Sequence, residues 1–221
     1  MMSRLRPVSM TDALVASLRE RILDGQFEPE AALGEIELAT AYGVARPTVR
    51  SAIQELVHEG LLRRERSRSA HVPRLTHDDV RDLFLVRTPL ELAVVETLVA
   101  RGVHPDGAEH ATRRMEALPR GASWSELVDA DLGFHRSLVE ATASSRLDRL
   151  YASLQAEIRL ALAQLRPAYP EPAALAAEHR ELLGAIAGGD AERAPALMRE
   201  HLDRAVADLT SAPANERAPA A

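Results

Sequence analysis

Residues 43–62, with the sequence GVARPTVRSAIQELVHEGLL, decide the fold of the N-terminal part of this chain. They begin with the glycine that stops a short helical segment, GEIELATAY, and continue into a longer helical segment that ends at Gly60. The tight turn at Tyr42-Gly43-Val44 joins the two segments, and another amphipathic helix, SMTDALVASLRERILDGQF, comes before them. Three helices joined in this way predict a helix-turn-helix.

The residues that follow predict a wing, which completes the first domain, and then a second, helical domain. The next segment, LLRRERSRSAHV, has two short stretches around an Arg/Ser tip and predicts a β-hairpin wing, so that residues 1–74 form a winged helix-turn-helix domain. We expect a linker at 75–78, followed by about six helices in an all-α bundle over 79–210. The Ala/Pro-rich residues 211–221 are expected to be a disordered tail. The predicted fold class is mainly α.

The composition is typical of a folded protein and narrows the site chemistry. The chain has 221 residues, 46% of them hydrophobic, and no cysteine, which excludes disulfides and thiolate ligands. No apolar run approaches the roughly 18 residues of a membrane span, and the N-terminus lacks the apolar core of a secretory signal. We therefore expect a cytoplasmic protein with no membrane partner.

Positive charge gathers in one region, although the whole chain has a net charge of −6. Residues 46–74 carry seven arginines and three glutamates, a net charge of +4. The region begins at the second helix of the helix-turn-helix, which in such domains enters the major groove of DNA. Arg46 and Arg50 lie one turn apart there and suit bidentate bonds to guanine, and Thr48 can add a phosphate or base contact. A solvated helix face is the alternative, but the winged-helix context favours double-stranded DNA.

These residues resemble a known family. GVARPTVRSAIQELVHEGLL resembles the helix-turn-helix signature of GntR-family bacterial transcription regulators, and ILDGQFEPEAALGEIELA resembles the stretch that precedes it. The resemblance covers about residues 9–74, although the family usually has an arginine at the position of Ile36. It implies that the recognition-helix contacts to DNA are Arg46, Thr48 and Arg50, and that Arg66 or Arg68 reaches the adjacent groove from the wing.

The predicted bundle places polar groups where aliphatic residues are expected. Asp131 and His135 fall on the apolar stripe of SWSELVDADLGFHRSLVEAT, and His179 and His201 fall on the stripes of two later helices. A single histidine in such a position is typical of a hydrogen-bonded core residue. Each group would cost roughly 1 to 3 kcal/mol if buried without a partner, and one divalent cation can satisfy all four.

This ligand set indicates the kind of metal. Asp131 and His135 have the i, i+4 spacing that directs two side chains to one point. Three imidazoles and one carboxylate suit Zn²⁺, Ni²⁺ or Mn²⁺, and we expect zinc. Four protein ligands complete a tetrahedral structural site but leave two positions of an octahedral site open for a ligand.

An arginine and a glutamate one turn apart, Arg87 and Glu91, lie on the stripe of the first predicted bundle helix. They can form an internal ion pair. Alternatively, Arg87 projects into the bundle and binds the carboxylate of a small ligand, a role that its planar guanidinium suits.

The bundle also resembles the FCD effector domain of the FadR subfamily of GntR regulators, over about residues 78–210. The resemblance rests on Asp131, Phe134-His135, Glu178-His179-Arg180, AIAGGDAERAPALMREHL, and Arg87 with Glu91. Metal-binding members hold a divalent cation with one Asp and three His, which Asp131, His135, His179 and His201 match. The resemblance implies a small carboxylate effector that completes the metal's coordination, with Arg87 as a further contact and Glu91 as a structural partner.

The favoured function is a DNA-binding transcriptional repressor and not an enzyme. Such a regulator binds a palindromic operator as a homodimer, because two recognition helices must match the two-fold symmetry of the DNA. One alternative is a regulator whose metal is purely structural. The other is a metal-dependent hydrolase, which needs a general base beside a metal-bound water. Glu178 lies about 100° around the helix from His179 and is badly placed for that task, which leaves Glu91 as the other candidate.

Overall fold

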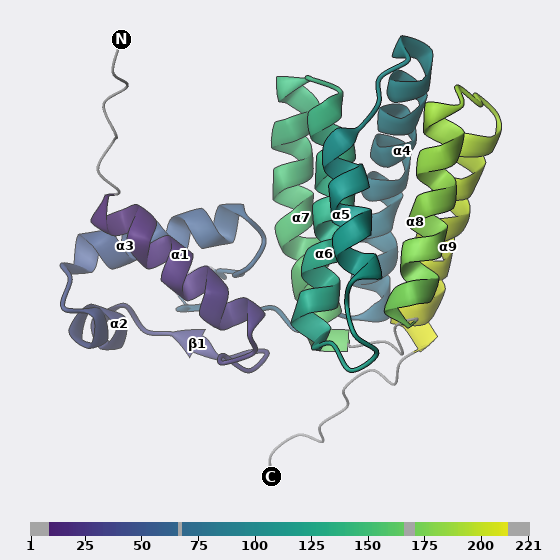
Figure 1. Cartoon of the computed structure of the whole chain (residues 1–221). Helices are drawn as coiled ribbons and strands as arrows, with labels where there is room; N and C mark the ends of the chain where they lie inside the picture. The colour runs from purple at the N-terminus through teal and green to yellow at the C-terminus, as the bar shows by residue number, and fades with distance from the viewer. Residues whose placement is uncertain (1–8, 66–67, 166–170, 212–221) are drawn as a thin grey trace. The chain divides into compact units, whose positions relative to one another are not determined.

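The computed structural model describes residues 9–65, 68–165 and 171–211 (Figure 1). The chain divides into two compact units, residues 1–74 and 75–221. The described residues are mainly helical, which confirms the predicted fold class. Within these ranges, no helix combines the length and the apolar character needed to cross a membrane.

The N-terminal unit contains the predicted helix-turn-helix. Its helices are α1 (Met10–Leu23), α2 (Glu35–Tyr42) and α3 (Arg46–His58), and its strands are β1 (Ala32–Leu33) and β2 (Ala70–His71). The α2 helix ends at Gly43, whose φ of 64° is the left-handed conformation that a glycine C-cap adopts. The α3 helix packs against α1 through fully buried side chains, including Val49, Ile53 and Leu18.

The wing differs from the expected simple hairpin. Strand β2 pairs antiparallel with β1, which precedes α2, in the register Ala32 to His71 and Leu33 to Ala70. The hairpin itself is a single bridge between Arg63 and His71. The sequence did not predict β1, because two residues are too few to show the alternation of a strand.

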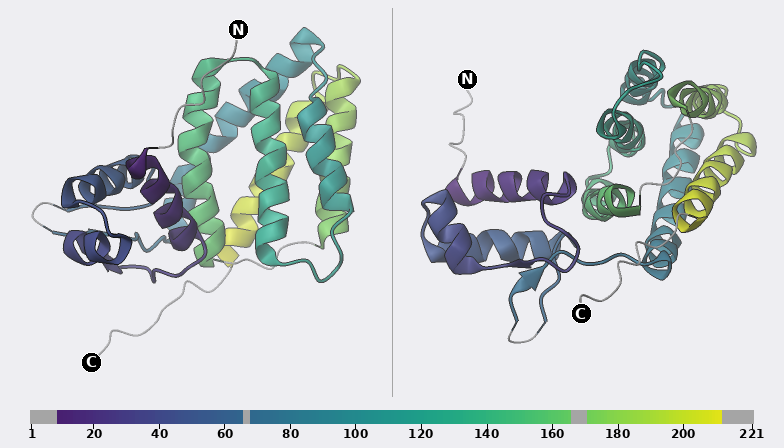
Figure 2. Two further views of the ribbon diagram at one scale, coloured as in Figure 1. Left: turned by 60° about the vertical axis from the view of Figure 1, so that its left-hand side comes forward. Right: turned by 90° about the horizontal axis from the view of Figure 1, so that it is seen from below.

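The C-terminal unit is the expected bundle, with six helices in residues 75–165 and 171–211. These helices are α4 (His77–Arg101), α5 (Asp106–Glu116), α6 (Trp124–Ala141), α7 (Ser145–Leu165), α8 (Pro172–Ala187) and α9 (Arg193–Ser211). They run side by side, and several are seen nearly end-on in the right-hand view of Figure 2. The α4 helix begins inside the predicted linker, since Thr76 forms a capping box with Asp79.

The apolar stripes of α4, α6, α8 and α9 turn inward and form the core of the bundle. Half of α6 is buried, including Phe134 and Leu138. The polar residues on these stripes are therefore enclosed with the apolar ones. Of the predicted tail, Ser211 is the last residue of α9, and residues 212–221 lie outside the described part of the chain.

Candidate metal centre

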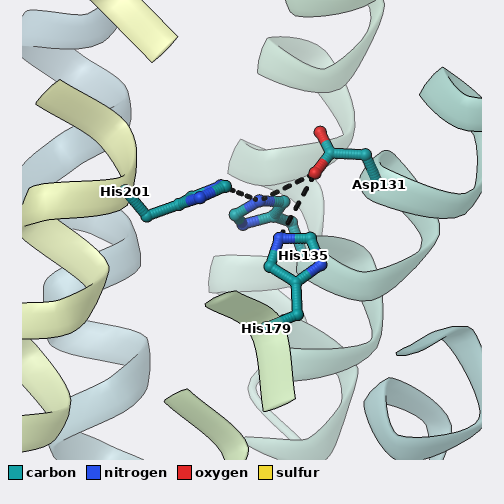
Figure 3. A group of neighbouring side chains, drawn as sticks. All are labelled: Asp131, His135, His179 and His201. Atoms are coloured by element: carbon teal, nitrogen blue, oxygen red, sulfur yellow. Dashed lines mark hydrogen bonds and ion pairs between the residues drawn. The ribbon is translucent and has the colours of Figure 1, made fainter. Parts of the chain in front are cut away.

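Four side chains from three helices meet inside the bundle. Asp131 and His135 come from α6, His179 from α8 and His201 from α9, and they point toward one another in Figure 3. One ligand atom from each lies within 4.8 Å of the other three, and all four residues are buried. The structure thus brings together every residue that the sequence predicted as a metal ligand.

Glu91 sets the orientation and the tautomer of His135. Its Oε2 lies 2.5 Å from His135 Nδ1. Burial raises the pKa of Glu91, but the positive charges of Arg87 and His135 and their hydrogen bonds lower it to about 2. The ionised carboxylate can only accept, so Nδ1 of His135 carries a proton and donates it to Glu91. When His135 loses its second ring proton, as metal binding requires, the lone pair of its Nε2 points into the cluster.

Glu178 does the same for His201. His201 Nδ1 lies 3.2 Å from Glu178 Oε2. The hydrogen bond from His201 is the main influence that lowers the pKa of Glu178, with a further contribution from the charge of Arg204. Glu178 was the first candidate for the catalytic base of a metal-dependent hydrolase. Its observed contact is instead that of a carboxylate that orients a candidate metal-ligand histidine.

The resulting arrangement calls for a positive charge. His135 Nε2 and His201 Nε2 lie 3.1 Å apart. Two lone pairs at this distance repel each other unless a proton or a cation lies between them. Two nitrogens bound to one zinc ion, each about 2.0 to 2.1 Å from it, are separated by about 3 Å. The separation of the two nitrogens is therefore compatible with one metal ion bound by both.

His179 and Asp131 complete the cluster. His179 Nε2 lies 3.3 Å from Asp131 Oδ1, and neither ring nitrogen of His179 makes a hydrogen bond within the described residues. Burial, followed by the charges of His201 and His135, lowers the pKa of His179 well below its ordinary value. His179 is thus neutral, as a metal ligand must be. Its ring stacks on Phe134, with centroids 3.9 Å apart, which fixes its orientation.

Arg87 lies beside the cluster and combines features of both interpretations of the sequence. Its Nε donates to Glu91 Oε1 over 2.6 Å, which is the internal ion pair. Its Nη2 is buried and makes no hydrogen bond to the part of the chain that the structure describes. Arg87 also lines a cavity of about 120 Å³ together with Asp131 and His201. The Nε edge of the guanidinium is thus held by Glu91, and the NH₂ group of the buried Nη2 remains available.

Tyr151 on α7 is a buried polar residue that the sequence did not single out. Its side chain is fully buried, and its hydroxyl has no hydrogen bond within the described residues. Burial raises the pKa of this hydroxyl well above its ordinary value, with the charge of Glu91 adding to the effect, so Tyr151 is protonated at neutral pH. A single tyrosine in a helical pattern gives no sequence signal of such a position.

The predicted DNA-binding residues lie in the N-terminal unit. Arg46 is exposed at the start of α3 and lines a groove with Arg64 and Arg68 of the wing. Arg50 is held by Glu35, with Nη2 3.0 Å from Oε2. Thr48 is half-buried in the first turn of α3. Arg68 pairs with Glu65, and the predicted wing residue Arg66 lies outside the described residues.

Models of two known protein domains match this chain. A model of the FCD domain matches residues 82–204, and a model of the bacterial regulatory proteins of the gntR family matches residues 10–72. The chain belongs to the GntR family. Like FadR-type GntR regulators, this one has an FCD domain at its C-terminus, as the sequence predicted, and it is a transcriptional regulator and not an enzyme.

Individual GntR relatives agree with this domain order. The solved structure of a GntR regulator from Rhodococcus sp. RHA1 is 29% identical, with a TM-score of 0.78 over 92% of this chain and 98% of that one. The transcriptional repressor GlaR of Escherichia coli is 28% identical over 84% of this chain and 89% of its own length. The Zn²⁺-bound FCD domain of TM0439 has a similar fold, with a TM-score of 0.52 and 19% identity over 62% of this chain and 95% of that one.

Proposed function

We propose that this GntR regulator is a repressor that binds a palindromic operator as a homodimer and responds to a small carboxylate bound beside a divalent metal ion. The observation that carries the proposal is the pair of histidine nitrogens 3.1 Å apart, each on a ring whose other nitrogen is bound to a carboxylate. Such a pair is stable around a cation and costly without one.

The metal ligands in this proposal are Asp131, His135, His179 and His201. Zinc is the first choice, because three imidazoles and one carboxylate suit it, while nickel and manganese are accepted by the same donors. The FCD domain of TM0439, which was solved with Zn²⁺ bound, agrees with this choice. The bound ion would supply a positive charge and a coordination position for a carboxylate oxygen.

Arg87 is the proposed contact to the effector. Its free Nη2 and the adjoining cavity support this role, because a purely structural metal site needs neither. Because Glu91 binds Nε, Arg87 can contact a ligand and keep its ion pair. The glutamate therefore joins the effector contact to the metal ligand His135.

The proposed DNA contacts are Arg46, Thr48 and Arg50 from α3, with Arg66 and Arg68 from the wing. Arg46 is the best candidate for a base contact, because it is exposed and no ion pair within the described residues holds it. Arg50 is oriented by Glu35, which also binds Arg64. Homodimer formation would use the apolar surface that Leu85 and Val86 of α4 and Leu150 of α7 expose.

The proposal is tested by measuring operator affinity with and without added carboxylic acids, in zinc-loaded and in metal-free protein. An operator is selected from a random DNA pool with the zinc-loaded protein, and its mobility shift is titrated with short carboxylic acids. We expect an acid to change the operator affinity of wild type and of His110→Ala, an exposed histidine outside the site, but not of Arg87→Ala. An acid response that is unchanged after complete metal removal would contradict the proposal.

A further inference from the structure

A large aliphatic side chain is exposed among charged residues in the N-terminal unit. Ile36, in the first turn of α2, has 60% of its surface exposed. A single exposed aliphatic residue is common on protein surfaces, so exposure alone assigns no role to Ile36. Its position is more informative, because Ile36 lines the groove that also contains Arg46 of α3 and Arg64 and Arg68 of the wing.

The contacts of the neighbouring Glu35 hold this turn of α2 beside the recognition helix. Glu35 Oε2 lies 3.0 Å from Arg50 Nη2 on α3, and Glu35 Oε1 lies 3.2 Å from Arg64 Nη2 on the wing. Arg50 is one helical turn from Arg46, the best candidate for a base contact. Ile36 is therefore held on the surface that carries the proposed base-reading arginines.

The acids on either side of Ile36 favour base edges over phosphates as its neighbours. Glu35 and Glu37 both line the groove. A carboxylate close to a phosphate is repelled by it, whereas the edge of a base pair has no net charge and presents hydrogen-bonding groups. The arginines of α3 and the wing supply the positive charge that attracts DNA to the same groove. The turn that carries Ile36 therefore suits the floor of a DNA groove better than its backbone.

The side chain of Ile36 matches an apolar group of DNA. Isoleucine has no hydrogen-bond donor or acceptor in its side chain, so Ile36 cannot bind phosphate oxygens or the polar atoms of the bases. The apolar group that a base pair presents in the major groove is the 5-methyl group of thymine. Isoleucine is also β-branched and stiff at χ1, so a contact to this methyl group costs little side-chain entropy.

We propose that Ile36 is a specificity-determining residue of the DNA-binding unit, and that it packs against the 5-methyl group of a thymine in each operator half-site. The inference rests on the proposed DNA-binding function and adds to it a contact residue and the base that this residue selects. The selected thymine lies close to the base that Arg46 contacts, because Ile36 and Arg46 line the same groove.

Replacement of single thymines by deoxyuridine tests this inference, because it removes only the methyl group. An operator is selected from a random DNA pool with the zinc-loaded full chain, each thymine is replaced in turn, and the affinity is measured by mobility shift. We expect a replacement at the contacted thymine of one half-site to weaken wild-type binding about fourfold, the value of one buried methyl group. Ile36→Ala should bind the original operator and this substituted operator equally well.

Two further variants sharpen the test. Met10→Ala is the matched control, because Met10 is also a large exposed apolar residue of the N-terminal unit but lies on α1. It should lose about fourfold at the same thymine, as wild type does. Ile36→Arg should select guanine in place of this thymine, since arginine suits the O6 and N7 atoms of guanine. Circular dichroism checks that each variant keeps the wild-type helix content.

A fourfold loss at the same thymine in Ile36→Ala would overturn the proposal, as would a wild-type affinity that no thymine replacement changes. If Ile36→Ala weakened binding to all DNA sequences equally and kept the response to deoxyuridine, Ile36 would contact the backbone, which also overturns the proposal. A wild-type protein that selects no operator would contradict the proposed DNA-binding function and, with it, this inference. The replacement series on wild type needs no variant, so a folding defect cannot imitate its result.

Discussion

At the scale of single residues, the carboxylate of Glu91 links two parts of the proposed site. Its two oxygens bind Arg87 Nε at 2.6 Å and His135 Nδ1 at 2.5 Å, and all three side chains are buried. The contact to His135 holds the ring in the tautomer that directs Nε2 toward the proposed metal site. A carboxylate in this position also raises the basicity of the metal-binding nitrogen.

Glu91→Gln tests this linkage. We expect the zinc affinity to fall by about 10- to 100-fold, because the amide removes the negative charge that stabilises the donated Nδ1 proton of His135. The affinity is measured by competition with a coloured chelator. Glu96→Gln, an exposed glutamate on the same helix, is the matched control and should keep the wild-type affinity. An unchanged affinity in Glu91→Gln would show that Glu91 only pairs with Arg87.

At the scale of secondary structure, two of the helices that carry candidate ligands, α6 and α8, have stabilising contacts of their own. The α6 helix supplies two ligands at i, i+4 and begins with a capping box of Ser123 and Glu126. The α8 helix is tied to α5 by Arg180, which binds Glu109 at 2.6 Å and Glu116 at 2.8 Å. These contacts fix the helix that carries His179, so this candidate ligand is held by a rigid element.

The α3 helix contains Arg46, the proposed base contact to DNA, and its substitution tests this role. Arg46→Ala should weaken binding to the selected operator about 10- to 100-fold, the usual loss of one arginine contact to guanine. Mobility shift at fixed salt measures the effect. Arg114→Ala on α5, an exposed arginine in the other unit, should bind as wild type does. If Arg46→Ala keeps full affinity, the base contacts come from other residues.

At the scale of the whole molecule, two buried groups, His179 and Glu91, make the stability of the metal-free C-terminal unit sensitive to acid. The pKa of His179 lies well below its ordinary value in the folded protein, mainly because of burial. Unfolding therefore takes up a proton below about pH 6.5, the ordinary histidine value, and stability is lost as the pH falls from there. Glu91 adds a second loss between its ordinary value of 4.5 and about 2.

Thermal unfolding of the metal-free protein checks this expectation. The melting temperature should fall between pH 7.5 and pH 5.5 in wild type, whereas His179→Leu should show a flatter dependence over the same interval. His110→Ala, which changes an exposed histidine, serves as the control and should keep the wild-type slope. A wild-type melting temperature that rises on acidification would mean that His179 gains a proton in the folded state.

The sequence predicts the features that depend on local conformation, and the tertiary structure is needed for those that depend on contacts between distant segments. The turn at Gly43, the apolar stripes and the polar residues on them depend on local conformation and helical period, so the winged helix-turn-helix, the bundle and the four candidate ligands followed from the sequence. Strand β1 did not, because it is stable only through pairing with β2, 37 residues later in the register Leu33 to Ala70.

Only the tertiary structure decided how the site is completed. The bonds of His135 to Glu91 and of His201 to Glu178 join residues 44 and 23 positions apart in the chain. The buried Arg87 Nη2, which makes no hydrogen bond within the described residues, and the cavity beside it lie where different helices pack together. Helical period specifies which side of a helix faces inward, but the partner that a buried side chain meets there depends on the packing of the whole bundle.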